Sequence, residues 1–317
     1  MTTPTLADIR AAAERIRPYA HRTPVMTCAS LDQKLGAQLF LKCENLQKVG
    51  AFKFRGACNA VFSLSETEAV RGVATHSSGN HAQALALSAQ LRGIPAYIVM
   101  PSNAPAVKKA AVAGYGGQIT YCEPTLAARE ATVAQLVATT GATVIHPYNN
   151  LAVITGQGTA TLELLDDVPD LDVILAPVGG GGLLSGTAIA ATELSSRIRV
   201  IAVEPAGADD AFRSLAAGKI LPSEKPQTIA DGLLTSLGTL TFPIIQQRVE
   251  QIVTVSETAI IEVMKFVWER AKLIVEPSAV VPLAALWERK IDLSGQRVGV
   301  ILSGGNVDLD RLPWQKV

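Results

Sequence analysis

The chain has 317 residues, of which 48% are hydrophobic and 18% charged, so it can bury a large core, most naturally in two lobes. Lys and Arg together number 28, as do Asp and Glu, and the isoelectric point is near 6.9. This balance excludes the electrostatic footprint of a nucleic-acid-binding protein. No apolar run approaches the roughly 20 residues of a membrane span. We therefore expect no nucleic-acid partner and no membrane partner.

The N-terminus and the cysteines predict a cytoplasmic protein. The segment Met1–Thr5 has no basic region followed by an apolar one, so a signal peptide is not expected. The cysteines show no C-x-x-C spacing and the histidines form no zinc pattern. We interpret the cysteines as reduced thiols, which is typical of the cytoplasm.

The first predicted element is a helix that begins after a cap at Thr5–Asp8, and short apolar runs and helical stretches then alternate along the chain. The predicted strands are Gln38–Lys42, Val73–His76, Ala96–Met100, Gln118–Tyr121, Thr143–His146, Val173–Val178, Val200–Val203, Gln251–Val255 and Val298–Leu302. Helical patterns lie between most of them, such as Asn80–Leu91 and Ala127–Thr140. This alternation predicts an α/β fold with mostly parallel sheets, and the number of strands favours two sheets.

Loops rich in Gly, Ser, Asn or acidic residues follow several of these strands. They are Ser77–His81, Gly179–Gly182, Glu204–Pro205 and Ser303–Asn306. Ligands of open α/β sheets bind beyond the carboxyl ends of the strands. We therefore predict that the ligand site is built from these loops.

The glycine run Gly179–Gly182 joins a predicted strand to a predicted helix. Its backbone N–H groups are unshielded and lie next to the positive end of a helix, which suits a phosphate. The run lacks both the Gly-Lys-Ser/Thr of a P-loop and the G-x-G-x-x-G of a dinucleotide site. Glu204 stands where a ribose-binding acid would be expected, but without the fingerprint a nicotinamide-dependent dehydrogenase is only a remote alternative.

Lys53 is flanked by Phe52 and Phe54. Desolvation between aromatic side chains would lower the pKa of the amine and favour its use as a nucleophile or in a Schiff base. Taken alone, the segment is better explained by a lysine whose ammonium extends past an apolar patch. A nucleophilic lysine together with a phosphate-binding loop, however, is what pyridoxal 5′-phosphate (PLP) requires.

With these motifs, the chain resembles the serine/threonine dehydratase and serine racemase branch of fold-type II PLP enzymes, which includes 3-hydroxyaspartate dehydratases. The matching segments occur in family order and are Ala51–Gly56, Thr75–His81, Gly156–Thr159, Pro177–Gly182 and Leu302–Asn306. The resemblance implies a two-domain fold like that of the tryptophan synthase β subunit, each domain a mostly parallel sheet covered by helices. It places residues 1–68 and 150–317 in a large PLP-binding domain and residues 69–149 in a small mobile domain.

The resemblance also implies roles at the cofactor. Lys53 would hold PLP through a Schiff base and, once freed, remove the α-proton of the substrate. Phe52 would pack beside the ring, Asn80 would hydrogen-bond its 3′-oxygen, and Ser303 would meet the pyridine nitrogen. The phosphate would be bound by the backbone of Gly179, Gly180, Gly181 and Gly182. A neutral hydroxyl cannot keep the pyridine nitrogen protonated as an aspartate can, which suits β-elimination over transamination.

Substrate contacts are implied in two segments. Ser77, Ser78, Asn80 and His81 begin a predicted helix, so their N–H and hydroxyl groups can bind the α-carboxylate, although Ser78 and Asn80 also fit ordinary helix capping. In serine racemases the serine that matches Ser78 returns a proton on the face opposite the lysine, which makes Ser78 a second catalytic candidate. Arg129 would either bind a second substrate carboxylate or pair with a neighbour on a solvated helix.

A divalent-cation site of the family is matched by Glu204, the carbonyl of Ala208 and Asp210. Carboxylates and a carbonyl suit Mg²⁺ or Ca²⁺, and we expect a structural rather than a catalytic ion. The alternative is that Asp209 and Asp210 only place negative charge at a helix start.

The predicted activity is that of a PLP-dependent ammonia-lyase (dehydratase). It converts a 3-hydroxy amino acid to a 2-oxo acid and ammonia by α-proton abstraction and β-elimination. The candidate substrates are 3-hydroxyaspartate, threonine and serine. We place 3-hydroxyaspartate first, because Arg129 could bind its second carboxylate. The alternative is a serine racemase with side dehydratase activity. A PLP-holding regulatory protein without turnover is disfavoured, because Lys53, Ser78, Asn80 and Ser303 are all present. The resemblance further implies a homodimer.

Overall fold

The computed structural model describes residues 3–77, 79–104 and 106–315. The strands are β1 (Val25–Met26), β2 (Gln38–Cys43), β3 (Val73–His76), β4 (Ala96–Pro101), β5 (Gln118–Cys122), β6 (Thr143–Val144), β7 (Val173–Pro177), β8 (Arg199–Pro205), β9 (Gln251–Val255) and β10 (Arg297–Leu302). The α-helices are α1 (Leu6–Ile16), α2 (Ala29–Leu35), α3 (Lys53–Phe62), α4 (Glu66–Ala69), α5 (Asn80–Arg92), α6 (Ala106–Gly114), α7 (Leu126–Thr140), α8 (Leu151–Asp167), α9 (Gly182–Leu194), α10 (Asp210–Ala217), α11 (Thr241–Arg248), α12 (Glu257–Arg270) and α13 (Pro277–Trp287). Short 3₁₀ turns are η1 (Glu44–Leu46), η2 (Lys48–Gly50), η3 (Ala206–Ala208) and η4 (Asp231–Leu233).

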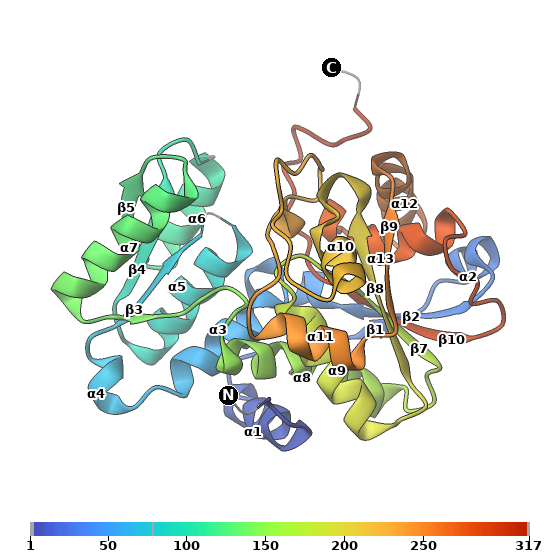
Figure 1. Cartoon of the computed structure of the whole chain (residues 1–317), viewed down its shortest axis with the longest axis horizontal. Helices are drawn as coiled ribbons and strands as arrows, with labels where there is room; N and C mark the ends of the chain where they lie inside the picture. Colours follow the sequence, from blue (N-terminus) through green and yellow to red (C-terminus); the bar gives the residue numbers. More distant parts are fainter. Residues whose placement is uncertain (1–2, 78, 105, 316–317) are drawn as a thin grey trace.

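The strands form two sheets, which lie side by side in Figure 1. The larger sheet has the order β1-β2-β10-β7-β8-β9 and the smaller one β5-β4-β3-β6. All neighbouring strands are parallel except β1 and β2. The predicted α/β fold with two mostly parallel, helix-covered sheets is confirmed.

Helices cover both faces of the larger sheet. Because successive side chains of a strand point to opposite faces, Leu175 packs toward α2, α12 and α13, whereas Ile174 packs toward α8 and α9. The core is built mainly from Val, Leu, Ile and Ala. Parallel strands buried on both faces read as continuous apolar runs, which is why the sequence revealed them.

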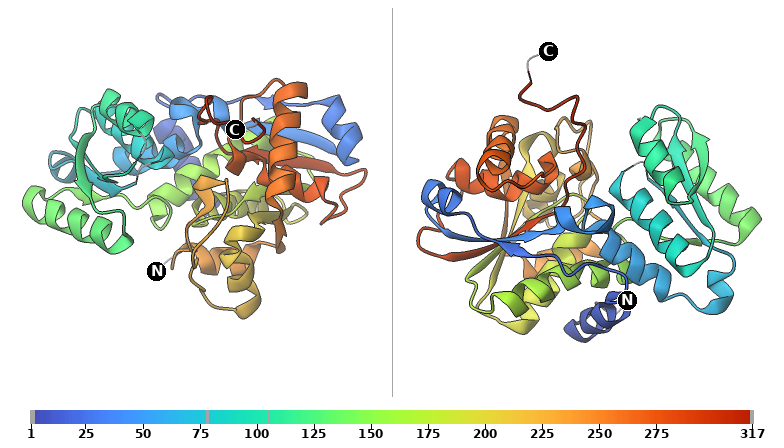
Figure 2. Two further views of the ribbon diagram at one scale, coloured as in Figure 1. Left: turned by 90° about the horizontal axis from the view of Figure 1, so that it is seen from above. Right: turned by 180° about the vertical axis from the view of Figure 1, so that it is seen from behind.

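The smaller sheet is covered in the same way. Leu85 of α5 and Val112 of α6 pack with Ile98 on one face, and Val133 of α7 packs with Val99 on the other. All strands of this sheet lie between residues 73 and 144, inside the predicted small domain. The views from above and from behind show this lobe beside the larger one (Figure 2). Helix α3 packs against α5 of one lobe and α8 of the other.

Several predicted boundaries needed correction. The predicted strand 143–146 ends at Val144, because Nδ1 of the His146 ring accepts hydrogen bonds from the backbone N–H groups of Tyr148 (3.3 Å) and Asn149 (2.9 Å), which turns the chain. Glu204 and Pro205 were predicted in a loop after a strand, but they belong to β8 and pair with β9. The short antiparallel strand β1 was not predicted at all.

The predicted N-terminal cap is confirmed, since Thr5 and Asp8 form a reciprocal capping box at the start of α1.

None of the helices in residues 3–77, 79–104 and 106–315 combines the length and the apolar character required to cross a membrane.

Candidate active site

Lys53 is the first residue of α3 and is held against the loop that follows β10. The backbone N–H of Phe52 donates to the carbonyl of Ser303 (3.0 Å), and Ala51 forms an isolated bridge with Gly304. The structure therefore brings Phe52 and Lys53 next to Ser303, which lies about 250 residues further along the chain. Loops at strand ends are expected to meet in this way in an open α/β fold.

The Lys53 amine is partly buried and faces the segment that links the lobes. Its Nζ donates to the carbonyl oxygen of Pro147 (2.9 Å) and lies 5.2 Å from the centre of the Phe52 ring. Burial lowers the pKa of Lys53 to about 8, although the negative charge of Glu276 opposes this shift. At pH 7 this raises the neutral, nucleophilic fraction from roughly 0.0003 to roughly 0.1. The amine is thus suited to attack an aldehyde near neutral pH.

The glycine loop forms a buried cradle of unpaired donors. It ends in Gly181, whose φ of 86° favours glycine, and leads into the N-terminus of α9. No acceptor in the part of the chain that the structure describes is bonded to the backbone N–H groups of Gly179, Gly180 or Gly181. A buried donor without a partner costs about 1–3 kcal/mol, so these groups fit an anion such as the cofactor phosphate.

Tyr148 covers this loop from the side of the linker. A Cβ atom on Gly180 would lie 2.3 Å from Cγ of the Tyr148 ring, so only glycine is tolerated there. The Tyr148 ring also packs edge-on against the ring of His146, with 4.5 Å between centres. Tyr148 therefore joins the linker between the lobes to the glycine loop, a contact that the sequence did not reveal.

The helix start that was predicted to bind substrate is present. α5 begins at Asn80, so the N–H groups of Asn80 and His81 have no acceptor within the helix. The hydroxyl of Ser77 accepts a hydrogen bond from the N–H of Gly79 (3.3 Å). Ser78 lies outside the described residues, so its role rests on the sequence.

The His81 ring is engaged within its own lobe. The side chain is 2% exposed, and Nε2 lies 3.0 Å from the carbonyl oxygen of Ile145. Burial lowers the pKa of His81 to about 3, so the ring is neutral. The backbone N–H of His81, rather than its ring, is therefore the group available to a substrate carboxylate.

Glu276 is a residue of this site that sequence reasoning missed. It immediately precedes α13, is 4% exposed, and accepts hydrogen bonds from Nδ2 of Asn80 (3.1 and 3.2 Å) and from the backbone N–H of Asn306 (3.2 Å). The only sequence signal was one acid between apolar neighbours, Val275 and Pro277, which resembles an ordinary helix start.

Arg129 lies in α7 and carries an unsatisfied group. Its side chain is partly buried, and Nε has no hydrogen-bond partner among the described residues. The described ion pairs do not include Arg129. The charge of Arg129 adds to the effect of burial in lowering the pKa of His76 at the end of β3. A guanidinium with an N–H group that has no partner can donate hydrogen bonds to an external anion.

The predicted cation ligands are buried carboxyl groups. Neither Glu204 nor Asp210 is exposed to solvent, and the Glu204 carboxylate accepts the backbone N–H groups of Ala211 (3.0 Å) and Phe212 (2.9 Å). Both Asp210 oxygens lack a hydrogen-bond partner in the described part of the chain. Burial raises the pKa of Glu204 to about 8 and that of Asp210 to about 6. Two buried acids, one of which has both oxygens unpaired, fit a cation.

No group of three or more His, Cys, Asp and Glu side chains in the described ranges is placed to hold a metal ion. A site at Glu204 and Asp210 therefore requires backbone or water ligands, such as the predicted carbonyl of Ala208.

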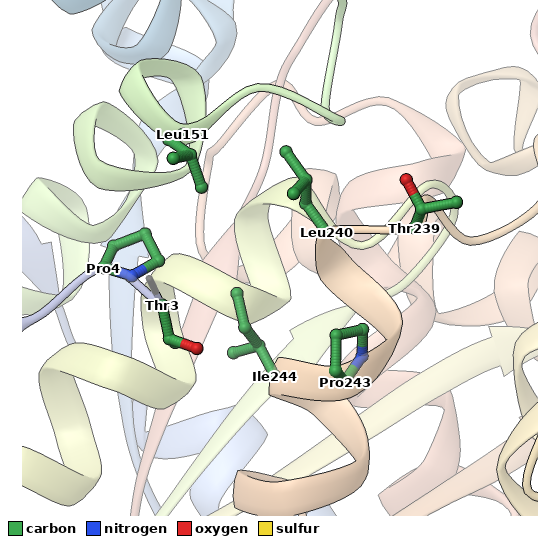
Figure 3. Close-up of a pocket in the computed structure, with 7 residues that line it drawn as sticks. All are labelled: Thr3, Pro4, Leu151, Thr239, Leu240, Pro243 and Ile244. Carbon is green, nitrogen blue, oxygen red and sulfur yellow. The ribbon is translucent and has the colours of Figure 1, made fainter. Parts of the chain in front are cut away.

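A surface cavity of about 260 Å³ does not include Lys53 in its lining (Figure 3). It is lined by Thr3, Pro4, Leu151, Thr239, Leu240, Pro243 and Ile244. It has no ionisable side chain in its lining and includes none of the predicted site residues.

Comparison with known proteins decides the family. The family described as pyridoxal-phosphate dependent enzyme matches residues 16–304. The chain belongs to this family. Together with relatives that are about half identical over nearly the whole chain, this match confirms the resemblance to the fold-type II dehydratase and racemase branch.

Among the relatives of this PLP enzyme is the beta-hydroxyaspartate dehydratase of Paracoccus denitrificans, which is 51% identical and covers 99% of this chain and 100% of its own. The L-threo-3-hydroxyaspartate ammonia-lyase of Saccharomyces cerevisiae is 48% identical over 98% of this chain and 96% of its own. The crystal structure of serine racemase from Dictyostelium discoideum has a TM-score of 0.94 at 51% identity, covering 97% of this chain and 100% of that one.

Proposed function

We propose that this PLP enzyme is an ammonia-lyase that converts a 3-hydroxy amino acid, foremost 3-hydroxyaspartate, to a 2-oxo acid and ammonia. The observation that carries the proposal is a lysine amine of lowered pKa in the same site as a buried glycine loop with unpaired N–H groups. The dehydratase from P. denitrificans and the ammonia-lyase from S. cerevisiae support the reaction.

When bound, PLP withdraws electrons from the α-carbon of an amino acid and so makes its proton acidic. Lys53 would hold the cofactor, and its Nζ would be the base that takes the α-proton of the substrate. The N–H groups of Gly179, Gly180, Gly181 and Gly182 would bind the phosphate, and Phe52 would pack beside the cofactor. The Ser303 hydroxyl would be the partner of the pyridine nitrogen, and as a neutral group it would not protonate that nitrogen, which favours elimination.

The substrate is held at both ends. The N–H groups of Asn80 and His81 and the hydroxyls of Ser77 and Ser78 bind the α-carboxylate at the start of α5. The guanidinium of Arg129 binds the second carboxylate of 3-hydroxyaspartate. We place the small domain at residues 69–149 and propose that its closure brings these groups onto the substrate and excludes water.

Replacing Arg129 with alanine is expected to lower kcat/KM for 3-hydroxyaspartate by about 10- to 100-fold, because a charge-assisted hydrogen-bonded pair contributes about 1.5–3 kcal/mol. Turnover of serine and threonine, which lack the second carboxylate, should change by less than about threefold. The measurement is release of 2-oxo acid from L-threonine, L- and D-serine and each 3-hydroxyaspartate isomer. An equal loss of kcat/KM on all substrates would contradict the assignment of Arg129. If the unaltered protein prefers serine or threonine, that amino acid and not 3-hydroxyaspartate is the substrate.

The second candidate is a serine racemase, favoured by the close match to the structure from D. discoideum. It requires that L-serine loses its chirality faster than it yields pyruvate. Following both products in the assay above separates the two activities, and Ser78→Ala should stop inversion while sparing elimination from the L-isomer.

We further propose a structural Mg²⁺ or Ca²⁺ ion at Glu204, Asp210 and the carbonyl of Ala208. Adding the cation to the chelator-treated protein at about 100 times its Kd should raise the thermal midpoint by about 5 °C. Asp210→Asn should abolish this rise, because it removes a charged ligand, whereas Asp209→Asn is the matched control and should keep it. The same rise in Asp210→Asn as in the unaltered protein would refute the site.

The homodimer and the cytoplasmic location also stay predictions. Sedimentation of the purified holoenzyme tests the first.

A further inference from the structure

Glu276 lies where the two lobes meet. Its carboxylate belongs to the larger lobe, yet it accepts hydrogen bonds from the Asn80 side chain at the start of α5 in the smaller lobe. A Cβ atom on Gly304 would lie 2.6 Å from Oε1 of Glu276, so the loop after β10 closes tightly on the carboxylate. The ion pairs found among the described residues do not include Glu276, and both of its side-chain contacts are with amide donors.

These contacts determine which way the Asn80 amide faces. A carboxylate only accepts hydrogen bonds, so the group of Asn80 that faces Glu276 has to be Nδ2. On the other side, Oδ1 of Asn80 accepts from Nδ2 of Asn306 (2.9 Å), which is itself held by the carbonyl of Val49 (2.7 Å). The Asn80 amide is thus fixed at both its nitrogen and its oxygen. Because Oε1 and Oε2 of Glu276 belong to one carboxylate, a single N–H of Nδ2 shared between them is enough for both contacts, and the second N–H is then available to another acceptor.

We propose that Glu276 is a positioning residue that fixes the orientation of the Asn80 amide, so that its second N–H is presented to the 3′-oxygen of the cofactor. This inference rests on the proposed function and on the contact with the 3′-oxygen that the family resemblance implies for Asn80. Burial raises the pKa of Glu276 to about 7, so the carboxyl group is an obligate acceptor mainly above that pH. An amide that turned over would present its oxygen to the cofactor oxygen, and the two acceptors would repel each other.

The test uses Glu276→Gln, which keeps the size of the side chain but can donate, and so permits the reversed amide. We expect the Kd of the apoprotein for PLP, measured by fluorescence titration at about pH 8, to rise about tenfold, and the absorption maximum of the bound cofactor to shift. Asn80→Ala should raise the Kd for PLP at least as much. The Kd of the double variant should equal that of Asn80→Ala within about twofold, because both changes remove the same interaction. Glu288→Gln is the matched control, since within the described part of the chain the Glu288 carboxylate accepts hydrogen bonds only from Ser256.

The outcomes separate this inference from the proposal beneath it. If Asn80→Ala binds PLP as the unaltered protein does, the role of Asn80 is wrong and the inference falls with it. If Asn80→Ala weakens binding but Glu276→Gln does not, the inference alone is overturned. Should Glu276→Gln fail to fold, Asn306→Asp tests the other contact, because its carboxylate cannot donate to Oδ1 of Asn80 and should weaken PLP binding in the same way. Unchanged binding in Asn306→Asp would likewise overturn the inference.

Discussion

Replacing Lys53 with alanine is expected to lower kcat for 2-oxo acid release by at least about 10⁴-fold, because the variant loses both the covalent anchor of the cofactor and the base that takes the α-proton. The lowered pKa of the Lys53 amine, about 8, is consistent with use of this amine as a nucleophile and a base near neutral pH. Binding of PLP should become weaker and reversible, but it should persist, because the glycine loop still offers its N–H groups to the phosphate.

The measurement is the rate of 2-oxo acid release at saturating PLP, with cofactor retention followed by dialysis. Lys219→Ala is the control, since Lys219 is an exposed residue in the turn after α10 and should leave both quantities unchanged. Turnover retained in Lys53→Ala at more than about a hundredth of the original rate would remove the lysine from the mechanism.

Replacing Arg55 with alanine is expected to produce the largest loss of stability, about 3–5 kcal/mol in the free energy of unfolding. Arg55 has no exposed surface, and its guanidinium donates to Glu44 (2.7 and 2.8 Å) and to Glu163 (2.7 and 2.8 Å). Lys42 binds the same Glu163 carboxylate (2.7 Å). Removing the guanidinium leaves a buried carboxylate at Glu44 whose charge is no longer compensated.

Urea unfolding of the apoprotein measures this loss. Arg17→Ala is the matched control, because the Arg17–Glu14 ion pair at 3.0 Å is highly exposed and such pairs contribute at most about 1 kcal/mol. A double-mutant cycle with Glu44→Gln should give a coupling energy above about 1 kcal/mol. A loss below about 1 kcal/mol in Arg55→Ala would show that the buried network does not hold α3, and with it Lys53, in place.

Much of the fold was accessible from local sequence patterns. The central strand β7 is a buried apolar run, and β3 and β9 were predicted with the boundaries that the structure shows. Failures arose where a side chain overrides the pattern: the His146 ring captures two backbone N–H groups and ends β6 early. The two-residue strand β1 is too short to produce a pattern at all.

For the site, the sequence by itself determined the family and was enough to predict the lysine and the glycine loop, because each of these is a contiguous motif whose chemistry depends on neighbouring residues. Tertiary structure alone decided which distant groups complete them. Glu276 reaches Asn80 across 196 residues, and Arg55 reaches Glu163 across 108. Likewise, the ring of Tyr148 lies against Gly180 because the linker between the lobes passes over the glycine loop. Such contacts have no local period or spacing, since they depend on how the packed sheets and helices bring separate strand ends to one place.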